Sequence, residues 1–408
     1  MKAGVTAGVT APPGATRVVI ALGTTQTLAW ASSYYLPAVL AVPMARELGM
    51  ASSWVFGAFS AALILSALIA PWVGRVIDAR GGRGMLALSN LVLAAGLLLL
   101  AVAQGPVVMA AGWLVLGVGM SMGLYDAAFA ALAGLYGRAA RGPITGITLI
   151  AGFASTVGWP LSAVLEESLG WRGACLVWAG LHLVIGLPLN RLLVPPAPPP
   201  ERVASTAGAE GPPPPRFAMP LLALVFATTW FVAGAMAAHL PVLLQSAGST
   251  PAAAIAAGAL IGPAQVAARV AEFSLLRRFH PLVSARLATI GHPLGALALA
   301  LFGGPAAAVF VLLHGMGNGV LTIAKGTLPL AVFGPTGYGA RLGMISAPSR
   351  LLQATAPFLF GVVLEQGGVS AALWLTSSCT LVALVALLLL RATPSAQAAK
   401  PAQAAKPA

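Results

Sequence analysis

Charged side chains are scarce in this chain of 408 residues: they make up 8% of it, against 59% hydrophobic residues, and the mean hydropathy is +0.92. A soluble domain usually carries about 25% charged residues, so the composition excludes that class. The apolar runs are long enough to cross a bilayer, which takes about 20 residues per helix. In lipid every backbone amide must be satisfied within its own segment, so we predict that these runs are helices.

Acidic residues are the rarer of the two charged classes, with 9 Asp and Glu against 22 Lys and Arg, which gives a formal charge of +13. Such an excess can indicate a nucleic-acid partner. Here the bases are scattered in short gaps between apolar runs and are not clustered with interleaved aromatic residues. We therefore predict no nucleic-acid partner and assign the bases to membrane topology.

Cysteine is almost absent. Cys175 and Cys379 both lie inside apolar runs, which is typical of small buried hydrophobic residues and not of a disulfide or a metal site. The histidines show no metal-ligand spacing on a common helix face. The sequence also lacks the Gly-x-x-x-x-Gly-Lys-Ser/Thr phosphate loop, which argues against ATP-driven pumping. We predict no enzyme activity, no cofactor and no metal.

The apolar runs divide into twelve predicted spans. They lie near residues 18–41, 54–73, 85–103, 107–133, 143–165, 172–193, 217–246, 252–276, 282–303, 305–333, 344–364 and 369–391. Proline-dense residues 194–216 are predicted to form an extended polar linker between two six-helix domains, 17–193 and 217–391. Residues 1–16 have no apolar core and are not a signal peptide, and residues 392–408 are predicted to be a disordered tail.

The bases predict the orientation of these spans. If the N-terminus is cytoplasmic, seventeen of the bases between Lys2 and Lys406 fall on the cytoplasmic side, and only Arg46 and Arg172 fall outside. This asymmetry is what the positive-inside rule requires. We predict an integral multi-pass protein with both termini in the cytoplasm, and the compact loops favour a bacterial inner membrane.

The two halves of the chain repeat one another. Gly117 and Gly119 precede Asp126 in the fourth span, and Gly315 and Gly317 precede Lys325 in the tenth. The glycine pairs are 198 residues apart, and the same shift places Glu167 on Glu365 and Gly170 on Gly368. Parallel repeats of six helices are typical of secondary transporters with a site between their halves.

A short basic loop separates the second and third spans. It has the order Gly-x-x-x-Asp-x-Arg-Gly-x-Arg, formed by Gly74, Asp78, Arg80, Gly81 and Arg83. This order resembles the signature loop of the major facilitator superfamily, with departures at Ala79 and Gly84, where that family often has a base. The resemblance covers nearly the whole chain outside the tails and linker. The loop at residues 277–280 corresponds to it in the second half, without the Gly and Asp.

The resemblance implies an all-α membrane fold of twelve helices in two pseudo-symmetric bundles, which rock about a midplane site in alternating access. It also implies a cytoplasmic gate. In that family the signature Asp docks on the start of the eleventh helix, near Gly343 here, where unpaired N–H groups carry a positive dipole end. Arg138 or Arg141 is the expected basic partner of Asp78.

Five ionisable residues fall inside predicted spans: Asp126, Arg269, Glu272, Lys325 and Arg350. Each buried charge costs about 2.5–3.5 kcal/mol on insertion scales, so each needs a partner or a cavity. Arg269 and Glu272 are one helical turn apart and can pair directly. Asp126 and Lys325 occupy nearly equivalent places in the two halves, where they can close a gate. Purely structural ion pairs are the alternative for all five.

Three bases and two acids leave one surplus positive charge in the membrane, which suits an anion bound by guanidinium groups. Bases in the eighth and eleventh spans resemble the monocarboxylate and oxalate–formate branches of the superfamily. That resemblance places Arg269 and Arg350 on a substrate carboxylate, while Asp126 or Glu272 takes up a proton. Further residues are expected to line the site: Gln26, Trp30, Tyr34 and Tyr125. An interfacial anchor is the alternative for Tyr34.

The predicted function is therefore secondary transport of a small organic anion by a monomer, by proton coupling or exchange. The alternative is an efflux carrier for drugs or a toxic metalloid. The fifth span contains Gly158, Trp159 and Pro160, and so lacks the Gly-x-x-x-Gly-Pro spacing of drug/proton antiporters. This absence counts against drug efflux without excluding it.

Overall fold

The computed structural model describes residues 14–196 and 216–390, and every regular element within these ranges is helical. The expected disordered tail and most of the expected linker and N-terminal tail lie outside the described residues. The helical content follows from the sequence, because long apolar runs with their own intrahelical hydrogen bonds are the structure that a bilayer accepts.

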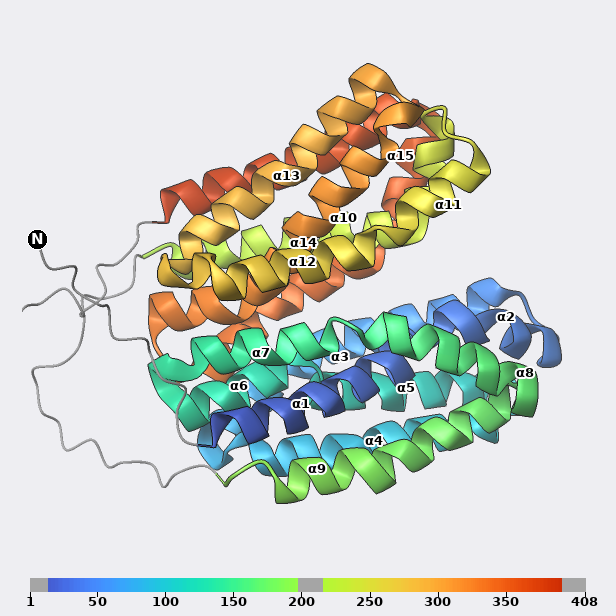
Figure 1. The fold of residues 1–408 in the computed structure, drawn as a ribbon. Helices are drawn as coiled ribbons and strands as arrows, with labels where there is room; N and C mark the ends of the chain where they lie inside the picture. Colours follow the sequence, from blue (N-terminus) through green and yellow to red (C-terminus); the bar gives the residue numbers. More distant parts are fainter. Residues whose placement is uncertain (1–13, 197–215, 391–408) are drawn as a thin grey trace, which may run out of the picture.

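The helices form two bundles that are joined between α9 and α10, as Figure 1 shows. The first bundle contains α1 (Ala15–Ala29), η1 (Trp30–Tyr34), α2 (Pro37–Glu47), α3 (Ser52–Arg80), α4 (Gly82–Ala101), α5 (Pro106–Gly123), α6 (Tyr125–Tyr136), η2 (Gly137–Ala140), α7 (Arg141–Ala151), α8 (Ala154–Leu181), η3 (His182–Gly186) and α9 (Leu187–Leu192). The second contains α10 (Ala218–Ser246), α11 (Pro251–Ala259), α12 (Ile261–Ser274), η4 (Leu276–Arg278), α13 (Pro281–Phe302), η5 (Gly304–Ala306), α14 (Ala307–Phe333) and α15 (Tyr338–Leu389). The domain boundaries at 17–193 and 217–391 stay a prediction.

Nine stretches of the described chain are long and apolar enough to cross a membrane. Two of them are too long for one crossing: Pro106–Leu192, with 87 residues, and Tyr338–Leu389, with 52. Each contains a glycine with positive φ where the chain bends, Gly170 (φ 71°) and Gly368 (φ 67°). These glycines are one repeat apart, so the two halves bend at matching places. Twelve crossings stay a prediction.

Several predicted spans are interrupted. The first predicted span contains a π-helical turn between α1 and α2. The fourth span breaks at Leu124 between α5 and α6, and the eighth span is divided at Leu260. The fifth breaks at Gly152 and Phe153, between α7 and α8. The eleventh was expected to begin near Gly343, but it begins at Tyr338. Apolar patterning does not register these breaks, because a broken span remains apolar throughout.

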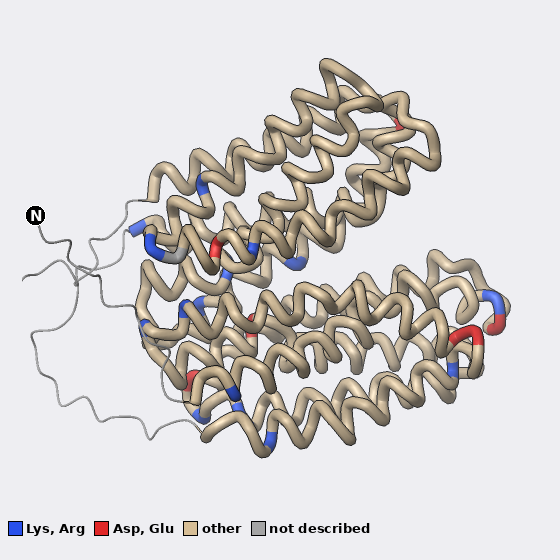
Figure 2. The backbone as a smooth tube through the Cα atoms, in the orientation of Figure 1, with Lys and Arg blue, Asp and Glu red and all other residues tan. Residues whose placement is uncertain are grey.

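The two bundles approach one another at the end that carries Ala15, Leu192 and Ala218, here called the linker end, and diverge toward the opposite end (Figure 1). Figure 2 shows most basic segments toward the linker end and few at the opposite end. Large hydrophobic side chains such as Trp54, Leu68, Phe302 and Trp374 are exposed on the outer surface. A surface of this kind is suited to lipid and not to water.

Candidate substrate site and gate

One carboxylate holds two bases between the bundles. The Asp126 carboxylate lies 3.1 Å from Lys325 Nζ and 2.7 Å from an Arg350 Nη atom. Asp126 belongs to the first bundle, whereas Lys325 and Arg350 belong to α14 and α15 of the second. All three side chains are buried or nearly so, with 7–11% of each exposed. This cluster, which we call the charge triad, carries one net positive charge and ties the two halves together.

Local structure places Asp126 where a carboxylate is stabilised. The backbone is extended at Leu124, so α6 starts afresh at Tyr125 and places Asp126 in its first turn. A helix N-terminus presents free N–H groups and a positive dipole end, which stabilise a carboxylate. The Lys325 ammonium also lies 5.0 Å from the centre of the Trp230 ring, within reach of a cation–π interaction.

A small cavity of about 40 Å³ lies against the charge triad. At about 10–15 Å³ per water, it has room for a few water molecules in this conformation. Its walls are mainly aromatic and apolar, with a few hydroxyl and amide groups. The lining residues besides the charge triad are Trp30, Tyr34, Leu63, Ser66, Met120, Leu124, Tyr125, Phe129, Trp230, Thr322 and Gln353.

Aromatic residues from the first bundle form one wall of this cavity. The Trp30 ring lies 5.1 Å from the centres of both the Tyr34 and the Tyr125 ring, and Tyr125 stacks on Phe129 at 5.3 Å. Tyr34 reaches the other bundle, where its hydroxyl accepts a hydrogen bond from Gln353 Nε2 at 2.9 Å. The Trp30 indole N–H is buried without a hydrogen-bond partner among the described residues, so it is a free donor at the cavity.

Gln26 lies elsewhere. It was expected at the substrate, but its side chain is buried and its amide nitrogen donates to the Gly123 carbonyl at the end of α5. The residue therefore closes the break between α5 and α6 and does not line the cavity.

Arg269 is a buried guanidinium bound only to neutral oxygens. It donates to the carbonyls of Thr148 at 3.2 Å and Gly319 at 3.5 Å, and to Gln265 Oε1 at 3.3 Å. Gly152 makes room for it, because a Cβ there would overlap the guanidinium. Arg269 thus lies between the bundles, because Thr148 belongs to the first bundle and Gly319 to the second, although it does not line the small cavity.

The predicted pair of Arg269 and Glu272 is wrong. Glu272 accepts instead from Arg141 Nη2 at 3.1 Å, and Arg141 also donates to the Phe279 carbonyl at 2.7 Å. The i, i+3 spacing allowed the expected pair, but Arg141 from the other bundle reaches the carboxylate with a second acceptor beside it. Glu272 therefore neutralises Arg141 at the linker end, and not a base near the cavity.

This correction changes the charge around the cavity. Three bases, Arg269, Lys325 and Arg350, lie in this region with the single acid Asp126, which pairs with the last two, so the surplus is two positive charges and not one. Buried cations without counter-ions are costly, and Arg269 in particular has only neutral partners. The region is electrostatically suited to receive an anion.

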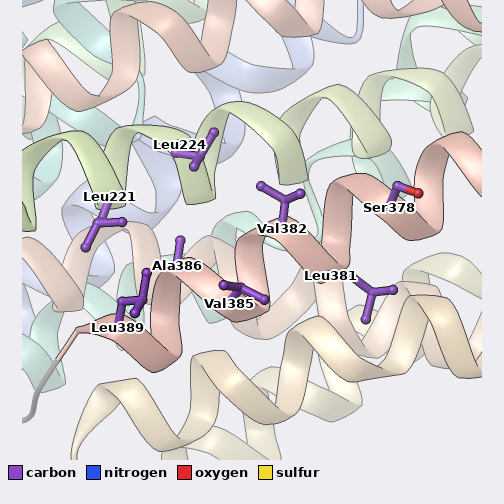
Figure 3. A pocket seen from close by; sticks show the side chains of 8 residues that line it. All are labelled: Leu221, Leu224, Ser378, Leu381, Val382, Val385, Ala386 and Leu389. Atoms are coloured by element: carbon purple, nitrogen blue, oxygen red, sulfur yellow. The ribbon is translucent and has the colours of Figure 1, made fainter.

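A larger hollow, of about 410 Å³, lies between α10 and the end of α15 (Figure 3). Its lining is apolar except for Ser378, and it carries no ionisable side chain. Leu224, Leu381, Val385 and Leu389 are also exposed there. An apolar groove of this kind is suited to lipid, and unlike the cavity at the charge triad it offers no charged group to a substrate.

The residues of the predicted gate lie where α3 meets the start of α15. Both carboxylate oxygens of Asp78 accept hydrogen bonds of 2.8 Å, from the N–H groups of Gly339 and Ala340. Gly74 lies one turn earlier, where a Cβ would overlap the Gly339 carbonyl. Asp78 thus caps a helix of the other bundle, as expected, but four residues before Gly343.

The expected basic partners of Asp78 are placed differently. Arg141 binds Glu272, and Arg138 lies beside Gly334 at the end of α14. Arg341, which belongs to the docked helix itself, is a base whose charge acts on Asp78, and it was not predicted from the sequence. Arg83 donates to the Arg191 carbonyl, and Arg80 is exposed at the end of α3.

A family model described as Major Facilitator Superfamily matches residues 22–324, well over half of the chain. The chain belongs to the major facilitator superfamily. Its structure is similar to that of the human organic anion transporter MFSD10 (TETRAN), with 18% identity over 92% of this chain and 100% of that one, and a TM-score of 0.73. It is also similar to the superfamily transporter FucP in its outward conformation, with 15% identity over 90% and 97% and a TM-score of 0.68. No curated protein matches the sequence.

Membership of the superfamily makes this protein a secondary transporter embedded in the membrane, and not an enzyme. The predicted fold class is therefore confirmed. The two named structures share the fold alone at these identities, so the branch of the superfamily stays a prediction.

Eight cavity residues of this superfamily member were missed from the sequence, among them Ser66, Trp230 and Gln353. Gln353 is one helical turn beyond Arg350. Residues at this i, i+3 spacing share a helix face, so the sequence could have placed Gln353 beside Arg350. Ser66 accepts from Arg350 and is a rare polar residue in an apolar run. Trp230 has no distinguishing pattern, because its place depends on how the bundles pack.

Replacing Asp78 with alanine is expected to loosen the superfamily gate. Loss of a helix-capping acceptor costs about 0.5–2 kcal/mol, and 1.4 kcal/mol changes an equilibrium constant about tenfold. We expect the ratio of closed to open molecules at the linker end to fall by about that factor, measured by spin-label distances between α4 and α13. Arg80→Ala, at the exposed end of the same helix, is the control and should leave the distances unchanged. An unchanged distance distribution in Asp78→Ala would contradict the gate.

A second prediction concerns pH and His280, which lies outside the membrane-spanning helices. His280 Nδ1 accepts from the Leu282 N–H at 3.2 Å and caps α13. Burial, and then the charges of Arg141 and Arg286, lower the pKa of His280 below its ordinary 6.5. The unfolded chain then binds the proton more readily, so stability falls as pH drops from about 6.5 toward the folded-state value.

His280→Asn keeps a capping acceptor that does not titrate. We expect a smaller loss of Tm between about pH 8 and pH 5 in this variant than in the wild type. Thermal unfolding of both purified proteins at several pH values measures the difference. Identical slopes would show that His280 does not contribute.

Proposed function

We propose that this protein carries a small organic anion, a carboxylate, through the site between its two bundles, coupled to a proton or to a second anion. The observation that carries the proposal is the surplus of two positive charges around Arg269, Lys325 and Arg350. A bound carboxylate supplies the counter-charge that Arg269 lacks, and guanidinium groups bind carboxylates in bidentate fashion.

The walls of the cavity support an organic anion over an inorganic one. Trp30, Tyr125 and Trp230 offer apolar ring faces, and the Trp30 N–H is an additional free donor. The cavity must enlarge to admit such a molecule, since about 40 Å³ holds only a few waters. The ion pairs of Asp126 now hold the bundles together across it, so breaking them opens the space.

Asp126 is the group we assign to proton coupling. It is the only carboxylate that touches the cavity bases in the described residues, and both of its bases lie on the opposite bundle. When Asp126 takes up a proton, Lys325 and Arg350 lose their counter-ion and an incoming carboxylate can replace it. The net charge of the triad with its ligand is then unchanged, which favours one proton per anion.

The human organic anion transporter MFSD10 has a similar fold, but the proposal depends on the charges of this chain and not on that similarity. The orientation with both termini in the cytoplasm, and a bacterial inner membrane, belong to the proposal as well, supported by the charge asymmetry along the bundles (Figure 2).

Counterflow in proteoliposomes tests the proposal. A panel of labelled carboxylates, from oxalate to benzoate, is offered to purified protein with and without a pH gradient. We expect saturable uptake of at least one carboxylate, stimulated by an inward proton gradient or by an unlabelled anion inside. Uptake or extrusion of cationic drugs or arsenite, with no carboxylate transported, would favour the efflux alternative.

A further inference from the structure

Two π-helical turns face one another in the first bundle. In η1 the Tyr35 N–H donates to the Trp30 carbonyl five residues earlier at 3.0 Å, and in η3 the Leu187 N–H likewise donates to the His182 carbonyl. Each turn holds one more residue than an α-helical turn, a rare geometry that is often found at functional sites. The η1 turn carries Trp30 and Tyr34, which belong to the aromatic wall of the cavity.

A chain of buried polar side chains joins the two turns. His182 Nε2 lies 2.7 Å from Ser32 Oγ in the middle of η1, and His182 Nδ1 lies 2.9 Å from Asn90 Oδ1 on α4. Ser32 and His182 have no solvent exposure, and Asn90 is also buried. Gly186, in η3, packs directly against Asn90, because a Cβ at Gly186 would overlap the amide oxygen of Asn90.

The hydrogen-bond directions follow from Asn90. Its amide nitrogen donates to the Leu86 carbonyl at 2.8 Å, so its oxygen faces the ring and His182 Nδ1 carries the hydrogen. In the neutral ring Nε2 is then an acceptor, and the Ser32 hydroxyl donates to it. Without His182, the Ser32 hydroxyl would have only the Leu28 carbonyl, 2.8 Å away within its own helix.

We propose that His182 is a positioning residue of the transporter, which holds η1 in its π-helical form and thereby sets Trp30 and Tyr34 against the substrate cavity. An α-helix turns about 100° per residue. If the π-helical turn of η1 became an α-helical turn, the helix after it would therefore rotate by about that angle. Tyr34 would leave its position 2.9 Å from Gln353, and a neighbouring side chain would replace it on the wall.

The role proposed for His182 rests on the proposed function only for its effect on transport. The structural part is measured without a substrate. The chain has five tyrosines, so 3-fluorotyrosine labelling of the full-length protein gives five ¹⁹F NMR signals, assigned by Tyr→Phe substitutions. The labelled residues are Tyr34, Tyr35, Tyr125, Tyr136 and Tyr338.

We expect His182→Leu to shift the signals of Tyr34 and Tyr35 and to leave those of Tyr136 and Tyr338 in place. Ser32→Ala breaks the same contact with a smaller change in volume, and should give the same shifts if His182→Leu fails to fold. The double variant should show no further shift. The matched control is Ser162→Ala, which removes a buried serine bonded to Trp178 at 3.1 Å in the same bundle, and should move none of the five.

Transport gives the second readout. In His182→Leu we expect KM for the transported carboxylate to rise about fivefold, with kcat little changed. This factor corresponds to the net free energy of one ordinary hydrogen bond. His182→Gln, whose amide can still bond Ser32, should recover most of the loss. A purely structural role would instead lower the amount of folded protein and leave KM alone.

Unshifted Tyr34 and Tyr35 signals in both His182→Leu and Ser32→Ala would overturn the inference, as would equal shifts of all five tyrosines. If the wild type transports no carboxylate at all, the proposed function fails, while the NMR spectra still decide whether His182 sets the position of η1.

Discussion

Arg269→Ala is expected to lower carboxylate uptake about a hundredfold while the protein remains folded. Truncating one partner of a buried charged contact costs about 2–5 kcal/mol, and 2.7 kcal/mol corresponds to a factor of about a hundred. The fold should persist because Arg269 has only neutral partners in the structure, so its removal leaves no unpaired charge behind. Initial rates of uptake in proteoliposomes, normalised to the reconstituted protein, measure the effect.

A matched control is Arg286→Ala. Arg286 is a partly buried guanidinium that also binds neutral oxygens, the carbonyls of Leu387 and Leu390, but it holds α13 to α15 away from the cavity. Its loss should lower thermal stability and spare the uptake rate per folded molecule. Equal uptake by Arg269→Ala and the wild type would remove Arg269 from the anion site and weaken the proposed function.

Gly74→Val is expected to abolish closure at the linker end. The helices α3 and α15 approach so closely there that even a Cβ at Gly74 would overlap the Gly339 carbonyl, and backbone contacts of this kind require glycine. Overpacking usually costs about 1–3 kcal/mol, and here the strain exists only in the closed conformation. We therefore expect the ratio of closed to open molecules to fall about five- to 150-fold, with slower transport as a result.

The control for Gly74 is Gly84→Val, ten residues further along at the start of α4, where an added Cβ meets no atom within 4 Å. Accessibility of an engineered cysteine at the linker end reports which conformation each variant adopts. If the engineered cysteine is as inaccessible in Gly74→Val as in Gly84→Val, closure does not require this close approach of α3 and α15.

Much of the architecture was readable in the sequence. The low charge and the long apolar runs require membrane helices, and the 198-residue repeat anticipates matching bends at Gly170 and Gly368. The signature loop also predicted that Asp78 reaches the other half. What failed was local: the start of the eleventh helix, the breaks within spans, and the partners of Arg138, Arg141 and Glu272.

The sequence alone determined the class of protein, because insertion in a bilayer depends on the apolar content and flanking charges of each segment, which are local properties. The tertiary structure decided which charges meet. Asp126 joins Lys325 and Arg350, and Glu272 joins Arg141 and not the neighbouring Arg269, because these contacts cross between bundles. Ion pairs form over a few ångströms, and residues 131 to 224 positions apart reach that distance only after the bundles pack.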